Sequence, residues 1–582
     1  MAVADPARTK QEREKEASQR QMMSGSEITC LSLEAEGVTT VFGYPGGAVI
    51  PLYDALPRHN MHHVLVRFEE WSALAADGYA RATGKVGVCI ATSGPGATNL
   101  VTGLANAQLD SVPVVAITGQ VVQPLIGRDA FQEVDITGIT LPVTKHNYLV
   151  QSPEEIAPTI KEAFYLAQSG RPGPVLIDIP KSVFLGQAPF KYPAAVGRRG
   201  YQPSILPNMR QVKLAAELIN QAKKPLIMAG HGIMLSGAEE AFARLVERTG
   251  IPVIFTLLGQ GSFPESHPLA LGLMGMHGHR HVNVALGEAD LIVNIGARFD
   301  DRATGKLPGF APNAKIVHVD IDPAEIGKNV KTDVPVVGDA REVVKVLIHE
   351  VEHRRHDEWM EWIDSQRNRT LEAALEARPE YPEPYTIIKS IAKATNGEAI
   401  YATDVGQHQM WAAQHLGLDH PNRWLTSGGL GTMGYGLPSA IGAKIGRPDL
   451  EVWAIVGDGG FQMSLNELAT ALQEGLDINI AVINNGYLGM VRQWQDLFNA
   501  KNYSEVAISG PDFVKLAEAY GATGIRVRKD EEIMPAIERA RAIPGPVVID
   551  FVIEPEANVW PIVPPGASNS EMMHNRYQDP DE

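Results

Sequence analysis

The sequence predicts an α/β protein made of three doubly wound domains, each built on a parallel sheet. Short apolar runs rich in β-branched residues alternate with helical stretches along most of the 582 residues. These runs are apolar almost throughout, as expected for strands that helices cover on both faces of a parallel sheet. At about 150 residues per domain, a chain of this length forms roughly two to four domains, and three such blocks are visible.

The first block covers residues 26–190 and follows a polar segment of mixed charge at 1–25, which we expect to be a mobile tail. Its apolar runs predict strands over 38–42, 64–68, 86–92, 112–118 and 175–179. Apolar residues at helical spacing predict helices over 70–83 and 153–168. The less regular stretch over 186–207 is expected to link this block to the next.

The second block covers 208–350, with predicted strands over 225–230, 253–257, 290–296 and 315–322. A charged helix is expected over 350–377, and three prolines that follow it mark a boundary. The third block covers 381–556, with predicted strands over 399–403, 452–456, 479–483 and 547–552. Residues 557–582 are expected to form a C-terminal tail.

Composition and charge exclude several classes of protein. The 51 basic and 68 acidic residues give a net charge of −17, so nucleic acid and anionic membranes are not expected partners. No apolar run reaches the roughly 18 residues that a membrane helix needs. The N-terminal segment mixes both charge signs, unlike a secretory or transit peptide. The two cysteines, Cys30 and Cys89, are too few for a disulfide framework, which favours a cytoplasmic protein.

The strongest chemical signal lies where two predicted strands of the third block end. The tripeptide 457–459, Gly-Asp-Gly, follows one strand, and the pair 484–485, Asn-Asn, follows the other. Because the carboxyl ends of parallel strands meet at one edge of a sheet, both motifs face the same ligand site. A carboxylate and an amide oxygen suit Mg²⁺ together with phosphate oxygens, and glycines let a phosphate approach the backbone. Gly-Asp-Gly alone is a common turn, but this pairing favours a magnesium–diphosphate site.

The two motifs resemble the diphosphate–magnesium signature of thiamine-diphosphate enzymes. This resemblance implies that Asp458, Asn485 and the main-chain carbonyl of Tyr487 hold the metal. It also implies a glutamate from another domain, which bonds a pyrimidine nitrogen of the cofactor and so promotes loss of the thiazolium C2 proton. Glu69 matches that glutamate, at the end of a predicted strand and before the segment 77–84. Its neighbour Glu70 is the alternative, although a glutamate there is usually solvated or caps a helix.

Further motifs resemble one family, the acetohydroxyacid (acetolactate) synthases, over nearly the whole chain. They lie, in order, at 43–48, 92–99, 129–133, 170–174, 178–181, 274–278, 296–302, 405–409, 431–435, 489–494 and 559–566. Each motif alone is moderate evidence, but their shared order is specific. The three blocks then correspond to a pyrimidine-binding domain, a central flavin-binding-like domain and a diphosphate-binding domain.

The resemblance implies a reaction, its cofactors and its partners. Pyruvate would be decarboxylated and the hydroxyethyl unit joined to pyruvate or 2-ketobutyrate, giving 2-acetolactate or 2-aceto-2-hydroxybutyrate for branched-chain amino-acid biosynthesis. Thiamine diphosphate, Mg²⁺ and a FAD without a redox role are the implied cofactors. In this family the equivalents of Glu69 and Asp458 at one cofactor come from different chains, so a homodimer or tetramer is expected. A small regulatory subunit is a further implied partner.

The resemblance also assigns roles to single residues. Catalysis and substrate steering fall to Glu69, Gln132 and Lys181. The substrate channel is expected at Phe131, Met490, Val491 and Trp494, although a tryptophan in a helix more often belongs to a core. Thiamine diphosphate is expected at Tyr44, Pro45, Gly46, Gly47, Asn99, Val405, Gly406, Gln407, His408, Gly431, Met433, Gly457, Asp458, Gly459, Asn485 and Tyr487. FAD is expected at Arg171, Gly230, His231, Gly232, Thr256, Leu257, Met276, His277, Gly296, Ala297, Arg298, Asp300, Arg302, Asp320, Ile321, Gly338 and Asp339.

Two segments depart from the family pattern. The stretch 68–71, Phe-Glu-Glu-Trp, stands where relatives usually have His-Glu-Gln, and Val122 stands where they often have proline. Two alternatives stay open. Glyoxylate carboligase shares the fold and the flavin but lacks a glutamate at the position of Glu69. A non-catalytic paralogue would have no reason to keep Glu69, Asp458 and Asn485 together.

Overall fold

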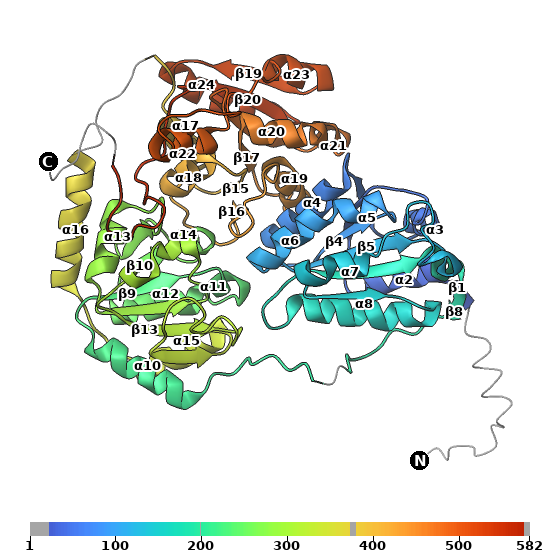
Figure 1. Ribbon diagram of the computed structural model, residues 1–582, viewed down its shortest axis with the longest axis horizontal. Coiled ribbons are helices and arrows are strands. Elements are labelled where there is room, and N and C mark those ends of the chain that lie inside the picture. Colours follow the sequence, from blue (N-terminus) through green and yellow to red (C-terminus); the bar gives the residue numbers. More distant parts are fainter. Residues whose placement is uncertain (1–21, 198–199, 373–379, 575–582) are drawn as a thin grey trace. The chain divides into compact units, whose positions relative to one another are not determined.

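The computed structural model describes residues 22–197, 200–372 and 380–574 (Figure 1). The described chain holds three six-stranded sheets in which every strand pair is parallel. The prediction of three doubly wound α/β domains is therefore confirmed. The chain divides into two compact units: the first carries the sheet of the first block, and the second carries the other two sheets. Within the described ranges, no helix is long and apolar enough to cross a membrane.

The sheet of the first unit has the strand order β3-β2-β4-β5-β7-β6. Its strands are β2 (Thr40–Gly43), β3 (His62–Leu65), β4 (Gly87–Ala91), β5 (Val114–Gln120), β6 (His146–Leu149) and β7 (Val175–Pro180). Its helices are α2 (Gly25–Ala35), α3 (Ile50–Ala55), α4 (Glu69–Thr83), α5 (Pro95–Asn99), α6 (Val101–Asp110), α7 (Ile136–Thr140), α8 (Pro153–Gln168) and α9 (Lys181–Leu185). The inner strands β4, β5 and β7 are buried along their whole length, as their continuous apolar runs predict.

The central sheet, in the second unit, has the order β11-β10-β9-β12-β13-β14. Its strands are β9 (Pro225–Ala229), β10 (Val253–Phe255), β11 (Ala270–Leu273), β12 (Leu291–Ile295), β13 (Lys315–Asp320) and β14 (Val334–Val337). Its helices are α10 (Met209–Gln221), α11 (Gly232–Leu235), α12 (Glu239–Thr249), α13 (Arg280–Glu288), α14 (Asp301–Thr304), α15 (Ala340–Glu350) and α16 (Asp357–Glu372). In order of sequence these strands read 3-2-1-4-5-6, the order of dinucleotide-binding domains.

Side chains of β9 alternate between two apolar cores, one on each face of the central sheet. Ile227 packs in the core that α10, α12 and α15 complete, whereas Leu226 and Met228 pack in the core that contains α13 and α16. This alternation follows from the two-residue period of a strand. Helices therefore cover both faces of the central sheet, as expected for a doubly wound domain.

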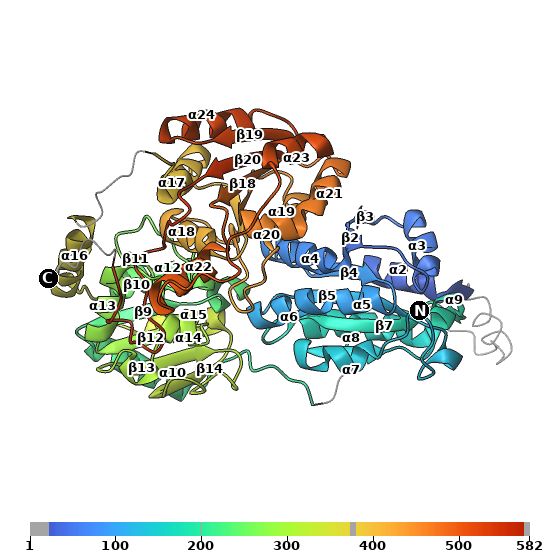
Figure 2. The same ribbon diagram turned by 45° about the horizontal axis from the view of Figure 1, so that its top comes forward.

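The third sheet has the order β16-β15-β17-β18-β20-β19. Its strands are β15 (Ile400–Thr403), β16 (Trp424–Leu425), β17 (Val452–Gly457), β18 (Ile478–Asn484), β19 (Thr523–Val527) and β20 (Val547–Val552). Its helices are α17 (Pro384–Thr395), α18 (Gln407–His415), α19 (Gly436–Gly446), α20 (Asp458–Ser464), α21 (Leu468–Gln473), α22 (Gly489–Phe498), α23 (Phe513–Tyr520) and α24 (Asp530–Arg541). Helices α17 and α24 lie side by side on this sheet (Figure 2). In order of sequence the strands read 2-1-3-4-6-5, which repeats the topology of the first unit.

Two expectations about connecting segments are corrected at the start of the chain. Met22–Ser24 form strand β1, which pairs antiparallel with β8 (Gln187–Pro189). The expected tail therefore does not extend to residue 25, and the expected linker over 186–207 begins with a strand. Ser24 also caps α2 through a reciprocal pair of hydrogen bonds with Glu27, which fixes the chain there. Residues 1–21 lie outside the described ranges.

The helix predicted after the second block is interrupted. The charged helix expected over 350–377 is replaced by α15, an extended stretch and α16, and its residues 373–379 lie outside the described ranges. The extended stretch is held by bonds to other segments: Arg248 Nε donates to the Val351 carbonyl at 2.8 Å. After Gly459 the chain likewise forms α20, a 3₁₀ turn and α21 and not one continuous helix.

Candidate active site

A pocket lies at the carboxyl edge of the third sheet, where the sequence predicts the diphosphate site. Residues expected at this site line it together: Val405, Gly406, Gln407, His408, Met433, Gly457, Asp458, Gly459, Asn485, Tyr487, Met490 and Val491. Two expected residues of the third block, Gly431 and Trp494, are not among those that line it. Other lining residues were not expected: Trp411, Gly460, Ile483, Leu488, Gly489 and Ile553. Segments far apart in the sequence thus converge because β15, β17 and β18 are neighbours in the sheet.

Asp458 and Asn485 each come directly after a strand of the third sheet, as the motifs predict. Asp458 is the first residue of α20, directly after β17, and accepts a hydrogen bond from the Gly486 amide at 2.8 Å. Asn485 follows β18, and its Oδ1 accepts from the Tyr487 amide at 3.1 Å. Burial raises the pKa of Asp458 to about 7, although the amides of Gly486 and Gly459 lower it. A divalent cation beside this carboxylate would favour its charged form, so the buried acid fits a metal ligand.

Gln407 connects the two halves of the pocket wall. Its Oε1 accepts from Asn485 Nδ2 at 3.2 Å, and its Nε2 donates to Gln493 Oε1 at 2.9 Å and to the Ala557 carbonyl at 2.7 Å. Gln493 exchanges two further hydrogen bonds with the backbone of Val559, both at 2.9 Å. The amide of Asn485 is therefore fixed by a buried network that reaches the C-terminal segment.

His408 offers an unused polar atom to this pocket. Its Nε2 is buried and has no hydrogen-bond partner among the described residues. Burial lowers the pKa of His408 to about 3, although a hydrogen bond between the ring and the Asp404 backbone opposes this shift, so the ring is neutral and carries a single N–H. A Cβ placed on Gly457, the last residue of β17, would lie 2.8 Å from the His408 ring, so only glycine fits at this strand end. A buried polar atom without a partner fits a site that a bound polar ligand completes.

Asp404 is a buried acid that the sequence reasoning missed. It directly follows β15, and its carboxylate accepts from the backbone amides of Val405, Gly434 and Gly436 at 2.7–3.2 Å. These bonds tie the glycine-rich turn before α19 to the segment that carries Gln407 and His408. The signal that could have found Asp404 is its place at a strand end, which it shares with Asp458.

The channel residues of α22 lie beside a residue expected to bind flavin. The Arg302 guanidinium lies 5.7 Å from the centroid of the Trp494 ring, within the second unit. Trp494 is only half-buried and packs edge-on against Phe498, so it is not a core residue. Val491 is 48% exposed and Met490 is half-buried, so this helix presents an apolar, accessible face.

Glu69 lies in the first unit among the loops that follow neighbouring strands. It begins α4, after β3, and its Oε2 accepts from Asn99 Nδ2 at 3.0 Å. A Cβ on Gly96 would lie 3.2 Å from Glu69 Oε1, so the glycine-rich loop after β4 passes close to this carboxylate. The Ala48 amide donates to Thr92 Oγ1 at 3.2 Å, which draws the loop of Tyr44 to Gly47 to the same edge. These contacts of its carboxylate with the neighbouring loops favour Glu69 over Glu70 as the functional glutamate.

The remaining expected residues of the first unit follow strands of the same edge or pack on its loops. Lys181 directly follows β7 and begins α9. Gln132 has a φ of 59° and packs its backbone on Gly94, 2.8 Å from where a Cβ would lie. Its neighbour Phe131 is 89% exposed, the most exposed large apolar side chain of the described residues.

Residues expected to contact FAD follow each strand of the central sheet. Those after β9 and β12 lie at its topological switch point, where ligands of such folds bind. There, a Cβ on Gly230 would lie 2.2 Å from the Gly296 carbonyl, so the two loops touch backbone to backbone. Asp300 and Asp339 also act as N-caps of α14 and α15. Arg171 belongs to the first unit, where its Nε donates to Ser111 Oγ at 2.9 Å.

Comparison with known proteins identifies the class of enzyme to which the chain belongs. Residues 23–139 match the N-terminal TPP binding domain of thiamine pyrophosphate enzymes, 212–347 match the central domain, and 404–551 match the C-terminal TPP binding domain. Together with the site, these three domains define a thiamine pyrophosphate-dependent enzyme. The next comparison narrows the class to one family.

Full-length relatives carry one activity in their names. The acetolactate synthase large subunit of Corynebacterium glutamicum is 51% identical over 564 residues, which cover 95% of this chain and 90% of that protein. The acetolactate synthase of Mycobacterium bovis is 50% identical over 570 residues, 96% of this chain and 92% of that protein. The probable acetolactate synthase large subunit of Methanocaldococcus jannaschii is 48% identical over 557 residues, 94% of each chain. The chain belongs to the acetolactate synthase large-subunit family, which confirms the resemblance seen in the sequence.

Proposed function

We propose that this protein decarboxylates pyruvate and joins the two-carbon unit to a second 2-keto acid, giving 2-acetolactate from pyruvate and 2-aceto-2-hydroxybutyrate from 2-ketobutyrate. The observation that carries the proposal is one pocket, in which Asp458 and Asn485 meet the apolar side chains of Met490 and Val491. A site for a metal-bound diphosphate thus adjoins a surface suited to the short carbon chain of a keto acid. The acceptor pair implies a role in isoleucine and valine biosynthesis, and we expect the protein to be cytoplasmic.

Thiamine diphosphate, when bound, supplies the electron sink for decarboxylation. Asp458, Asn485 and the Tyr487 carbonyl would hold Mg²⁺ on the diphosphate, because they offer a carboxylate, an amide oxygen and a main-chain oxygen. His408 would face the diphosphate with the ring nitrogen that has no partner among the described residues. Met433 would support the bend of the cofactor from the same pocket.

Glu69 would bond a pyrimidine ring nitrogen through its carboxyl group, with Asn99 holding the side chain in place. A carboxyl group at that atom can hold or release a proton as the ring changes tautomer, which is general acid–base work. Lys181 and Gln132 would steer the keto-acid carboxylate, since an ammonium and an amide are suited to bind it. Phe131 would add an apolar wall.

FAD in the central domain is a further part of the proposal, in a role that is not redox chemistry. Its support is the strand order of dinucleotide-binding domains and the position of the expected residues after the strands of that sheet. Arg302, 61% exposed, would bridge the flavin region and Trp494.

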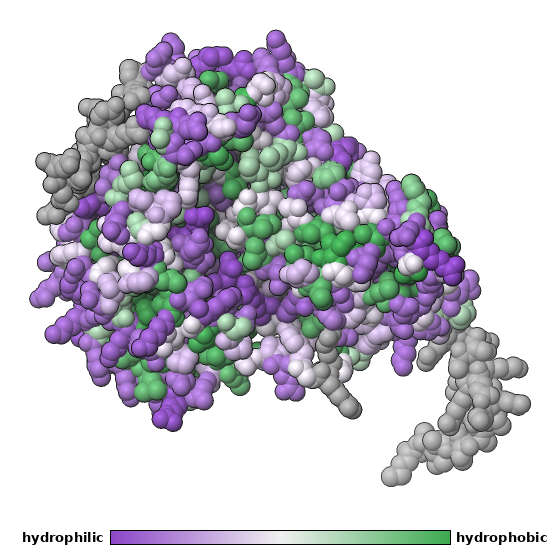
Figure 3. Space-filling model, viewed as in Figure 1, coloured by the Kyte–Doolittle hydropathy of each residue, from purple (hydrophilic) through white to green (hydrophobic). Residues whose placement is uncertain are grey.

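We also propose a homodimer, or a tetramer built from it, with a small regulatory subunit as a further partner. Glu69 and Asp458 belong to separate compact units, and a dimer lets one chain's Glu69 complete its partner's site. Large apolar side chains are exposed on the first unit, including Leu125, Phe131, Ile139 and Leu141. Apolar side chains gather on that unit around α7 (Figure 3). A monomer would leave this surface in water. Sedimentation that finds active monomers would overturn the dimer.

Product analysis tests the activity. With pyruvate, thiamine diphosphate and Mg²⁺ we expect carbon dioxide and 2-acetolactate in equal amounts, and with added 2-ketobutyrate the mixed product. Glyoxylate as sole substrate separates the alternative: glyoxylate carboligase would release carbon dioxide and form the three-carbon semialdehyde. No product from either substrate, with cofactor bound, would favour the non-catalytic paralogue.

A further inference from the structure

A second cavity, of about 300 Å³, lies in the second unit away from the residues discussed so far. It opens between the edge strand β11, helix α16 and the segment after α18, and shares no lining residue with the candidate active site. None of its lining residues is among those expected to contact flavin. Its volume is at the lower end of the range for ligand pockets, so a small molecule suits it.

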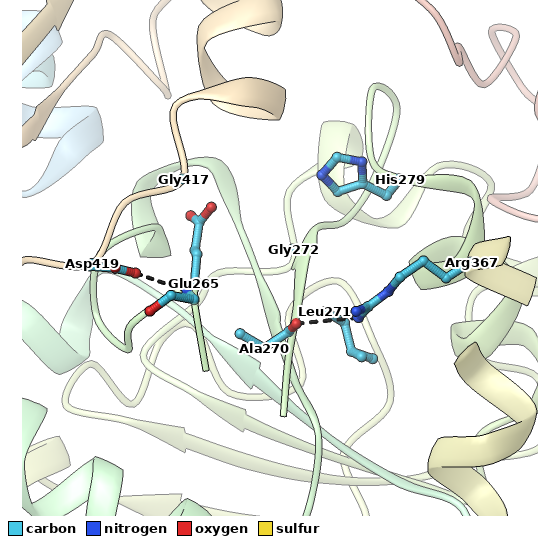
Figure 4. Close-up of a pocket in the computed structure, with 9 residues that line it drawn as sticks. Glu265, Ala270, Leu271, Gly272, His279, Arg367, Gly417 and Asp419 are labelled. Carbon is cyan, nitrogen blue, oxygen red and sulfur yellow. Dashed lines mark hydrogen bonds between the residues drawn. The ribbon is translucent and has the colours of Figure 1, made fainter. Parts of the chain in front are cut away.

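Two acidic side chains stand on one side of this cavity. Figure 4 shows Glu265 and Asp419 together at one wall. Gln260 Nε2 donates to Glu265 Oε1 at 3.1 Å and to the Ala413 carbonyl at 2.6 Å, which holds the glutamate in place. Asp419 Oδ1 accepts from the Ser266 amide at 2.9 Å. Hydrogen bonds therefore position both carboxyl groups at this wall, with the Leu418 backbone also bonding Glu265.

A guanidinium and an imidazole stand on the opposite side (Figure 4). Arg367 Nη2 donates to the Ala270 carbonyl at a long 3.4 Å, and its Nη1 lies 3.8 Å from Asp364. Its Nε is buried and has no partner among the described residues. A guanidinium has five N–H donors in a fixed plane, so this group is far from satisfied.

His279 is held rigidly over the cavity. A Cβ on Gly272, whose φ is +104°, would lie 2.5 Å from His279 Cδ2, so the ring rests on a bare backbone. On its other side the ring stacks on His281 at 5.5 Å between centroids, and His281 Nε2 lies 2.8 Å from the Leu271 carbonyl. Burial lowers the pKa of His279 to about 4, so at neutral pH the ring is uncharged and Arg367 is the cation of that wall.

The charge pattern excludes simple ions as the best ligand. A simple anion would be repelled by Glu265 and Asp419, and a simple cation would be repelled by Arg367. A molecule that carries both charges a few ångströms apart can pair with the charged groups of both walls. Ala270 and Leu271 also line the cavity and offer an apolar surface to a small side chain of that molecule. Burial also raises the pKa of Glu265 to about 7, with Gln260 and the Leu418 backbone opposing the shift. An ammonium beside Glu265 would restore its charged form.

We propose that this cavity binds a small free α-amino acid, with its carboxylate on Arg367 and His279 and its ammonium between Glu265 and Asp419. Charge-assisted hydrogen bonds at both ends give the recognition, and the cavity volume limits the side chain. The proposal does not depend on the carboligase reaction, because it concerns binding at a separate place.

The test measures binding of L-alanine and L-leucine to the full-length protein by equilibrium dialysis. We expect one site per chain and measurable occupancy at ligand concentrations on the order of 10 mM. N-acetyl-L-alanine lacks the ammonium and L-alanine methyl ester lacks the carboxylate, so each should bind about tenfold or more weakly than L-alanine. Absence of binding by both amino acids would overturn the proposal, as would equal binding of the N-acetyl derivative, which would mark a simple anion site.

Matched variants locate the site. Arg367→Met keeps the apolar stem and should weaken L-alanine binding about tenfold or more. Glu265→Gln should weaken it in the same direction. The controls are Arg244→Met and Glu240→Gln, an exposed ion pair of α12, which should leave binding unchanged. Unaltered binding to folded Arg367→Met would refute the assignment; if that variant fails to fold, the derivative series on the unchanged protein still decides.

Discussion

Replacing Asp458 with asparagine isolates the electrostatic cost of a buried carboxylate at the candidate metal site. Asp458 is 4% exposed, and burial raises its pKa from 3.8 to about 7. The difference between these values corresponds to about 4 kcal/mol, at about 1.4 kcal/mol per pKa unit. Because the folded-state pKa is the higher one, the favourable contribution is complete below pH 3.8 and is lost as the pH rises to about 7. Asparagine cannot ionise and removes this dependence.

The assay compares thermal unfolding midpoints of the cofactor-free wild type and Asp458→Asn across the range from acid to mildly alkaline pH. Relative to the variant, the wild type should lose up to about 4 kcal/mol, or about 10 °C in a domain of this size. Saturating Mg²⁺ and thiamine diphosphate should restore the wild type at neutral pH, because they stabilise the ionised carboxylate. They should leave Asp458→Asn nearly unchanged.

Asp178→Asn is the matched control for this comparison. Burial also raises the pKa of Asp178 to about 7, and its carboxylate bonds Thr118 and Gln120 in the first unit. The Asp178 variant should therefore show the same kind of pH dependence relative to wild type, but it should retain the gain from Mg²⁺ and cofactor. The reasoning about Asp458 is refuted if the wild type and Asp458→Asn keep a constant difference in midpoint across the whole range.

Three further substitutions test other parts of the site. Glu69→Gln should lower kcat by about 10²- to 10⁴-fold while cofactor affinity, measured by calorimetry, falls only modestly; Glu70→Gln is its control, and a reversed order would show that the wrong glutamate was chosen. Gly457→Ala should abolish cofactor binding, because its Cβ would lie 2.8 Å from the His408 ring, and unchanged affinity would contradict that fit. Trp494→Leu should lower the ratio of 2-ketobutyrate to pyruvate product in a competition assay, with little change in melting temperature because the side chain is only half-buried; an unaltered ratio would remove Trp494 from the channel.

The sequence predicts inner strands well and edge strands poorly, for a physical reason. Strands β4, β5 and β17 are buried on both faces and read as mostly apolar runs. By contrast β6, β11, β14, β16 and β19 were not predicted, and each lies at the edge of its sheet. An edge strand is short or partly exposed, as in His146–Leu149, where no residue is fully buried. Its identity depends on pairing with a neighbour that is distant in sequence.

The candidate site likewise has parts that the sequence predicts and parts that depend on contacts between distant segments. Motifs contiguous in sequence, such as 457–459, could be placed at strand ends before the structure was known. The network that joins Gln407 to Gln493, Ala557 and Val559 could not be predicted, because its bonded pairs are 66 to 150 residues apart and no member has a distinctive local pattern. The pairing of Arg302 with Trp494 likewise requires two domains to meet.

Asp404 and Asp458 show where local pattern stops being informative. Both acids follow a buried strand and precede a glycine within two residues, and burial raises the pKa of both, to about 6 and about 7. Both Asp404 oxygens, however, accept hydrogen bonds from the amides of neighbouring turns, so this carboxylate organises the backbone. Asp458 accepts the Gly486 amide on Oδ2 and lines the pocket, which leaves Oδ1 suited to a cation. The role of each acid follows from which donors the fold brings to it, and the tertiary structure alone determines those donors.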